Sequence, residues 1–151
     1  GWQALLDSDI LPMRRGIAAA LPFLKASANG AIICMSSTGA VEEFMGVQPY
    51  NAMKAAVMAY SAALSQMLAA DRIRVNCITP GPVWTDDGPW AHIKTAMTEF
   101  YDGIVAQIPL GQMTQGTDLA KTIAFAASPA AAGMTGANIV VDGGFTKRVQ
   151  F

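Results

Sequence analysis

The stretch GAIICMSS, from Gly30 to Ser37, decides the fold of this chain. Asn29-Gly30 is a turn dipeptide, and an uninterrupted apolar run from Ala31 to Met35 follows it. A strand with one solvated face alternates apolar and polar residues, whereas a parallel strand covered on both faces is a continuous apolar run. The stretch therefore predicts a short, buried parallel strand that ends at a pair of serines.

The rest of the chain alternates strand-like and helical segments. Two more short apolar runs are IRVNCI at 73–78 and NIVVD at 138–142. Apolar residues recur near the helical period in four other segments, at 2–27, 49–70, 90–106 and 117–127. Strands that alternate with helices need crossover connections. The sequence therefore predicts an α/β domain with about three parallel strands and flanking helices.

Proline and capping residues set the expected helix boundaries. Pro12 predicts a kink in the first helix, because proline removes a backbone N–H. For the same reason, Pro22 predicts that this helix stops near Leu21. Thr117 or Asp118 is expected to cap the fourth helix.

Composition limits the class of protein. A chain of 151 residues forms one domain by default, and 52% hydrophobic with 14% charged residues is too apolar for disorder. The net charge of −1 and the lack of a basic run argue against nucleic acid or an anionic membrane as partner. The longest apolar stretch, 55–70, contains two serines and a glutamine and is too short to span a bilayer. The apolar excess fits a buried sheet and a surface that packs against something outside this chain.

Cys34 and Cys77 each lie in a strand-like run, and we interpret them as buried free thiols. Neither belongs to a Cys-x-x-Cys pair and His92 is the only histidine, so no metal site is expected. His92 reads as a surface residue of a helix, with a substrate contact as the alternative. Reduced thiols fit a cytoplasmic protein.

Three side chains can carry acid–base chemistry. Ser37 follows a strand directly, and ligands of open α/β sheets bind beyond the carboxyl ends of the strands. Tyr50 and Lys54 are four residues apart near a helix start, so they share a face. An ammonium about 4 Å from a phenol stabilises the phenolate by roughly 1–4 kcal/mol, and the helix N-terminus acts in the same direction. Such a phenol can exchange a proton with a substrate oxygen held by the serine, although spacing alone also allows a surface Tyr–Lys pair.

Four motifs, taken in order, resemble the short-chain dehydrogenase/reductase family. They are GAIICMSS (30–37), YNAMKAA (50–56), IRVNCITPGPVWT (73–85) and GMTGANIVVDGG (133–144). The family places a serine thirteen residues before the tyrosine of its Tyr-x-x-x-Lys motif, the separation between Ser37 and Tyr50. The resemblance implies a Rossmann-like, doubly wound parallel sheet. It also implies Tyr50 as the acid/base, Ser37 as the substrate-orienting residue, and Lys54 as the residue that promotes the phenolate and holds the nicotinamide ribose.

The resemblance further implies a nicotinamide site after the second strand, with NAD or NADP as the cofactor. Pro80 and Gly81 would border the nicotinamide, because two prolines fix this loop and glycine lets the backbone approach a flat ring. The Val83 backbone would contact the carboxamide, and Thr85 would lie near it.

Two nearby motifs need a choice between chemical and structural roles. Ser36 competes with Ser37, but consecutive strand residues face opposite ways and the thirteen-residue offset favours Ser37. Asp142-Gly143-Gly144 reads as a tight structural turn after the last strand.

Two departures from the family pattern matter. Asp9 stands at the position of an asparagine that completes the family's catalytic tetrad. It is either a tolerated variation or a fourth catalytic residue that binds near Lys54 and shifts the pH optimum. The glycine-rich dinucleotide fingerprint is absent. Residues 1–151 are therefore expected to be the C-terminal catalytic half of a dehydrogenase domain, inactive with NAD(P)H when isolated.

Three functions remain open. The leading one is an NAD(P)-dependent oxidoreductase acting on a small alcohol or carbonyl compound. A non-redox relative that catalyses elimination or epoxide formation is the second, and the retained Lys54 argues against it. The third is a non-enzymatic remnant that serves as an oligomerisation or binding module. The family's dimer interface and the small residues spaced along 55–67 predict a homodimer or homotetramer. Four aromatic residues either line a substrate pocket or pack a mobile lid: Trp84, Trp90, Phe100 and Tyr101.

Overall fold

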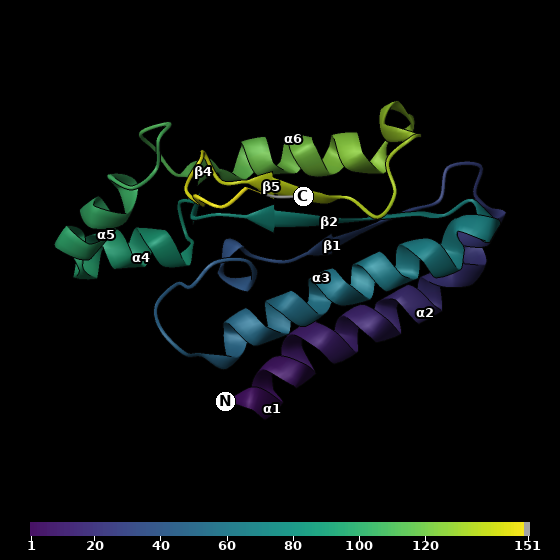
Figure 1. Ribbon diagram of the computed structural model, residues 1–151, viewed down its shortest axis with the longest axis horizontal. Helices are drawn as coiled ribbons and strands as arrows, with labels where there is room; N and C mark the ends of the chain where they lie inside the picture. The colour runs from purple at the N-terminus through teal and green to yellow at the C-terminus, as the bar shows by residue number, and fades with distance from the viewer. Residues whose placement is uncertain (150–151) are drawn as a thin grey trace.

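A three-stranded parallel sheet forms the centre of the computed structural model, which describes residues 1–149 (Figure 1). Its strands, in spatial order, are β1 (Ala31–Met35), β2 (Arg74–Pro80) and β5 (Asn138–Val141). The pairing places Cys34 opposite Cys77 and Pro80 opposite Val141. The prediction of a parallel sheet built from these three apolar runs is confirmed.

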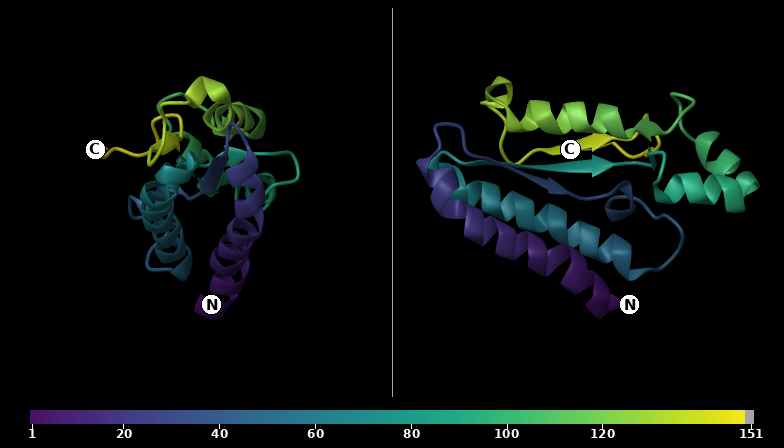
Figure 2. Two further views of the ribbon diagram at one scale, coloured as in Figure 1. Left: turned by 90° about the vertical axis from the view of Figure 1, so that its right-hand side faces the viewer. Right: turned by 180° about the vertical axis from the view of Figure 1, so that it is seen from behind.

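Helices cover both faces of the sheet (Figures 1 and 2). Two long helices, α2 (Leu11–Ala26) and α3 (Pro49–Leu68), lie on one face, and α6 (Gly116–Ala127) lies on the other. The larger core lies between the sheet and the α2–α3 pair, where Val57, Leu64 and Leu68 of α3 are buried. β2 is buried along nearly its whole length, so its polar residues Arg74, Asn76 and Thr79 need hydrogen-bond partners inside the protein. The doubly wound layer arrangement is confirmed.

A π-helical turn interrupts the first helical segment. The order is α1 (Trp2–Leu5), the π-turn η1 (Leu6–Ile10) and then α2. Pro12 lies in the first turn of α2, directly after this π-turn, where its missing N–H costs no intrahelical bond. The predicted stop near Leu21 is wrong, because α2 continues through Pro22. Pro22 and Ala18, whose carbonyl loses a hydrogen bond, are both exposed, so water can satisfy that carbonyl.

Residues 86–108 lie between the two-residue strands β3 (Val83–Trp84) and β4 (Thr114–Gln115), and we call this segment the lid after the expectation from the family resemblance. It contains α4 (Pro89–Ala96) and α5 (Thr98–Val105). The single helix predicted over 90–106 is wrong in detail, because Met97 leaves the helical region with φ −144° and ψ 58°. A second core of Ile104, Ile108 and Met113 holds this region together. Strands of two residues are too short to show a period in the sequence.

Arg74 fastens α6 to the sheet. Its buried guanidinium donates to the carbonyl of Ala126 at 2.7 Å and to those of Ala127 and Ser128 at 3.1 Å. These carbonyls end α6, where the helix dipole favours a cation. The predicted cap of this helix by Thr117 or Asp118 is wrong, because α6 already begins at Gly116 and no side chain caps its N-terminus.

The two cysteines are buried free thiols, as predicted. Burial raises the pKa of the Cys34 thiol to about 11, so this thiol stays protonated at neutral pH. His92 is exposed on α4. Within residues 1–149, no group of His, Cys, Asp and Glu side chains is arranged to hold a metal ion. None of the helices described for the chain has the length and hydrophobicity that crossing a bilayer requires.

Candidate active site

The predicted reaction centre lies where β1 ends and α3 begins. Ser37 comes two residues after the last residue of β1, and Tyr50 and Lys54 lie in the first two turns of α3. The connecting loop opens with a 3₁₀ turn, η2 (Thr38–Ala40), that packs against α3. The loop therefore folds back along the helix, so the end of β1 and the start of α3 meet at the carboxyl edge of the sheet.

The two serines at the end of β1 have different partners. Ser36 is buried, and its hydroxyl donates to the carbonyl oxygen of Lys54 at 2.8 Å. This bond ties β1 to α3 and uses the hydroxyl proton. Ser37 Oγ instead accepts a hydrogen bond from the backbone N–H of Gly39 at 3.2 Å, so its own O–H remains free to donate. Ser37 is thus the serine that can hold a ligand oxygen.

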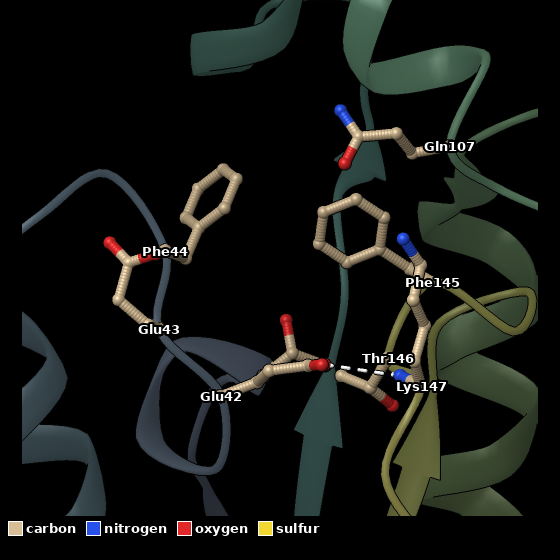
Figure 3. A pocket seen from close by; sticks show the side chains of 8 residues that line it. Glu42, Glu43, Phe44, Gln107, Phe145, Thr146 and Lys147 are labelled. Atoms are coloured by element: carbon tan, nitrogen blue, oxygen red, sulfur yellow. Dashed lines mark hydrogen bonds between the residues drawn. The ribbon is translucent and has the colours of Figure 1, made fainter.

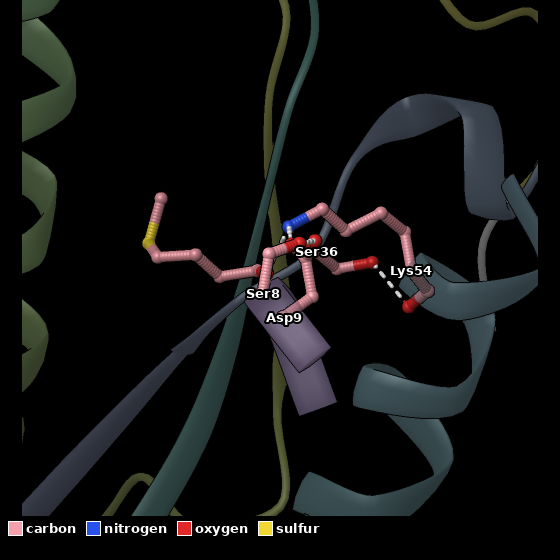
Figure 4. Close-up of polar contacts among 5 residues, drawn as sticks. Ser8, Asp9, Ser36 and Lys54 are labelled. Carbon is pink, nitrogen blue, oxygen red and sulfur yellow. Dashed lines mark hydrogen bonds and ion pairs between the residues drawn. The ribbon is translucent and has the colours of Figure 1, made fainter. Parts of the chain in front are cut away.

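Lys54 contacts both Asp9 and the end of β1 (Figure 4). Its ammonium donates to Asp9 Oδ1 at 2.7 Å and to the carbonyl oxygen of Met35 at 3.5 Å. The side chains of Lys54 and Asp9 are only 14% and 21% exposed, so salt screens this ion pair less than a surface pair. An ammonium carries three N–H donors, and these two bonds leave one free.

Asp9 reaches Lys54 from the π-turn η1. Such turns redirect side chains and often occur at functional sites. The Ser8 hydroxyl donates to the second carboxylate oxygen of Asp9 at 2.9 Å. The hydrogen bond from Lys54 lowers the pKa of Asp9 below its usual 3.8, so the carboxylate is ionised at neutral pH.

The Tyr50 side chain is open to solvent. It is 39% exposed, and the Lys54 ammonium lies 5.6 Å from the centroid of its ring. This distance is within the range of a cation–π contact. The structure therefore brings Asp9, Lys54 and Tyr50 into one chain of contacts, with the phenol at its accessible end.

The predicted nicotinamide loop follows β2. Pro80 is the last residue of β2, Val83 begins β3, and Thr85 is exposed in a separate surface pocket. Gly81 has a packing role of its own, because an added Cβ would lie 2.6 Å from Cβ of Asp142. The glycine is therefore needed for the contact between β2 and the end of β5, whatever ligand the loop holds.

Asp142 organises the turn after β5. Its carboxylate accepts hydrogen bonds from the Gly144 N–H at 2.9 Å, the Thr146 N–H at 2.8 Å and the Thr146 hydroxyl at 2.7 Å. Gly143 and Gly144 adopt positive φ angles of 64° and 85°, which favour glycine. This network supports the structural reading of the Asp-Gly-Gly motif and directs the following residue, Phe145, toward the loop after β1.

A pocket of about 170 Å³ lies beside the loop that joins Ser37 to Tyr50 (Figure 3). The rings of Phe44 and Phe145 both border it and meet edge to face, with centroids 5.8 Å apart. No sequence pattern marks these two residues, because Phe44 and Phe145 are far from each other in the chain and belong to no local motif. The four expected aromatic residues pack in pairs: Trp90 stacks on Phe100, and Trp84 meets Tyr101 edge to face while also lining a second pocket. The other pocket residues are Thr38, Glu42, Glu43, Gln107, Thr146 and Lys147.

Comparison with known proteins gives the same answer from sequence and from structure. Residues 1–146 match the family described as enoyl-(acyl carrier protein) reductase. Isoepoxydon dehydrogenase patN of Aspergillus clavatus is 36% identical over 152 residues, covering 99% of this chain and 58% of that protein. The NADPH-bound short-chain oxidoreductase of Pseudomonas aeruginosa PAO1, described as containing an atypical catalytic center, superposes with a TM-score of 0.87 at 28% identity over 98% of this chain and 58% of that one.

L-sorbose reductase of Gluconobacter frateurii, solved with NADPH and L-sorbose, has a TM-score of 0.85 and 29% identity over 98% of this chain and 59% of that one. The chain thus spans less than two thirds of the length of each of these relatives, while nearly all of its own length is matched. The chain belongs to the short-chain dehydrogenase/reductase family.

Proposed function

We propose that the whole protein is an NAD(P)-dependent oxidoreductase that interconverts an alcohol and a ketone or aldehyde. The observation that carries the proposal is the chain of contacts from Asp9 through Lys54 to Tyr50, with the Lys54 ammonium 2.7 Å from Asp9 and 5.6 Å from the Tyr50 ring centroid. The related structures support it, since one is bound to NADPH and another is a reductase solved with NADPH and L-sorbose.

Tyr50 transfers the proton. In the reducing direction its hydroxyl donates a proton to the substrate oxygen as the carbonyl becomes an alcohol. The Ser37 O–H donates a hydrogen bond to the same oxygen and holds it in place. Lys54 stabilises the phenolate that remains, and in the oxidising direction that phenolate removes the proton from the alcohol. A reduced nicotinamide, when bound, supplies the hydride.

The residues of this chain fit a nicotinamide cofactor at two points. Lys54 keeps one N–H donor after its bonds to Asp9 and Met35, and a ribose hydroxyl is a suitable acceptor for it. The loop from Pro80 to Thr85 lies at the carboxyl end of β2, where cofactors of such sheets bind. Its half-buried Val83 backbone would hold the carboxamide. These points support NAD and NADP equally.

A small substrate with an apolar part suits the pocket that Thr38, the residue after Ser37, helps to line. Its volume of about 170 Å³ and the rings of Phe44 and Phe145 accommodate a ring or short chain. Glu42 and Lys147 contribute polar groups at the same place. We therefore assign this pocket to the non-reacting part of the alcohol or ketone.

The test is carbonyl-dependent oxidation of NADH and NADPH by the purified whole protein, followed by absorbance with butanone, cyclohexanone and 4-phenyl-2-butanone. We expect turnover with at least one ketone and one cofactor. Nicotinamide binding without turnover of any of them would favour elimination or epoxide chemistry, as in non-redox members of the family. Failure to bind either nucleotide would favour a non-enzymatic binding module. Either result would overturn the proposal.

A further inference from the structure

The carbonyl oxygen of Phe44 is held by two side-chain amides. Gln48 Nε2 lies 3.2 Å from it and Asn51 Nδ2 lies 3.1 Å from it. Asn51 directly follows Tyr50 in the first turn of α3. The loop after β1 is therefore tied at Phe44 to the helix start that carries the acid/base.

The other end of the Asn51 amide lies against Gly39, two residues after Ser37. A carbonyl can only accept hydrogen bonds, so the amide nitrogen must face Phe44 and Oδ1 must point the other way. Asn51 Oδ1 is buried and has no hydrogen-bond partner among residues 1–149. A Cβ added to Gly39 would lie 2.5 Å from it, so the two residues are in close contact. The backbone N–H of Gly39 donates to Ser37 Oγ at 3.2 Å.

Phe44 links this arrangement to the substrate pocket and to the lid. Its ring meets that of Phe145 at an interplanar angle of 82° and borders the pocket (Figure 3). The same ring packs against the buried cluster that includes Ile104 of α5 and Ile108. One residue thus has its carbonyl bound to the catalytic helix and its ring placed against both pocket and lid.

We propose that Asn51 is a positioning residue that couples the reaction centre to the wall of the substrate pocket. One side of its amide supports the turn that orients the Ser37 hydroxyl, and the other fixes Phe44. Loss of the amide removes the contact with Gly39 and leaves the Phe44 carbonyl held by Gln48 alone. The loop is then less firmly fixed, so the enzyme loses its preference for substrates with an apolar ring at Phe44. This inference rests on the proposed oxidoreductase function.

The test uses Asn51→Ala and Asn51→Asp in the whole protein. The aspartate keeps the shape but cannot donate to the Phe44 carbonyl while ionised, and it guards against misfolding caused by a cavity. Butanone and 4-phenyl-2-butanone share the reacting methyl ketone and differ by a phenyl group on C4. We expect both variants to lower the ratio of kcat/KM for the phenyl ketone over butanone by roughly tenfold. A general loss of stability would lower both values together and leave the ratio unchanged.

Hydrogen exchange gives a readout that does not depend on turnover. We expect both variants to raise amide exchange in residues 38–48 and in 98–108 by about tenfold or more, with no change in β2. Gln66→Ala, an exposed site at the other end of α3, is the matched control and should behave as the parent. An unchanged selectivity ratio, or unchanged exchange in 38–48, would overturn the inference. If the unmutated protein reduces neither ketone, the proposed oxidoreductase function is wrong. The hydrogen-exchange data then still show whether Asn51 fixes the loop.

Discussion

The carboxylate of Asp9 makes direct contact with the lysine of the reaction centre, where the family pattern has a neutral asparagine. At 2.7 Å from Lys54 Nζ it offsets part of the charge that favours the Tyr50 phenolate. We expect Asp9→Asn to move the kcat/KM profile of the whole protein toward lower pH, because the charge of the Lys54 ammonium is then uncompensated. Superimposable pH–rate profiles would show that the ion pair is only structural.

The same ion pair makes a pH-dependent contribution to stability. Lys54 lowers the pKa of Asp9 from 3.8 in the folded state, so the contribution is present above the unfolded-state pKa and is lost as pH falls through the folded one. We expect Asp9→Asn to reduce the free energy of unfolding by about 1 kcal/mol near neutral pH. Urea titrations should show this difference shrinking below about pH 4; a difference that grows on acidification would contradict the account.

Single residues differ in how far the sequence predicts them. Ser37, Tyr50 and Lys54 were picked out by the four family motifs rather than by spacing alone. Asp9 was picked out by its match to the family's asparagine position, and the structure places it 2.7 Å from Lys54. Asn51 and Phe44 were not found, because the bond between a side-chain amide and a loop carbonyl leaves no period or motif. Gly81 was noticed for a ligand contact, whereas the structure adds its packing against Asp142.

Arg74 is the link on which the attachment of α6 to β2 depends. Its guanidinium satisfies three carbonyls at the end of α6 while buried. Arg74→Met keeps much of the volume and removes these charged hydrogen bonds, so we expect the free energy of unfolding to fall by about 3 kcal/mol. Arg15→Met, at an exposed site of α2, should change it little. Equal urea midpoints for Arg74→Met and the parent would refute the assignment.

Secondary-structure elements were predictable where the sequence carries a buried apolar run or a long helical period. The three core strands and the helix of Tyr50 and Lys54 follow from apolar runs and from Pro49 at the helix start. The boundary near Pro22 was wrong because an exposed carbonyl tolerates the missing bond. β3, β4 and the break at Met97 depend on tertiary contacts within the lid.

On the scale of the whole molecule, the outer side of the α2–α3 layer carries unusually exposed apolar side chains. Phe23 of α2 is 78% exposed and Met67 of α3 is 63% exposed, and α3 also carries the exposed small residues Ala59, Ala62 and Ala63. We predict a homodimer or homotetramer built through this layer. Light scattering should give a monomer for Ala63→Arg and an oligomer for Ala106→Arg, at the end of α5. A monomeric parent would contradict the prediction.

The chain spans 58% of the length of the isoepoxydon dehydrogenase that it matches, and no glycine-rich phosphate loop occurs in its sequence. Lys54 and the Pro80–Thr85 loop would hold only the nicotinamide end of the cofactor. The cofactor's pyrophosphate would lack the helix N-terminus that usually binds it. We predict that an isolated 1–151 polypeptide does not turn over NAD(P)H. Steady, ketone-dependent oxidation of NADPH by this purified polypeptide would contradict that view.

The central claim is that Tyr50 transfers the proton. The most direct test compares Tyr50→Phe with Tyr60→Phe, a change at a partly buried site of the same helix, by steady-state kinetics and NADPH titration on the whole protein. We predict that Tyr50→Phe lowers kcat by about 10²–10⁴-fold, with nucleotide affinity close to that of the parent, and that Tyr60→Phe retains kcat. A Tyr50→Phe variant with the kcat of the parent would contradict the account.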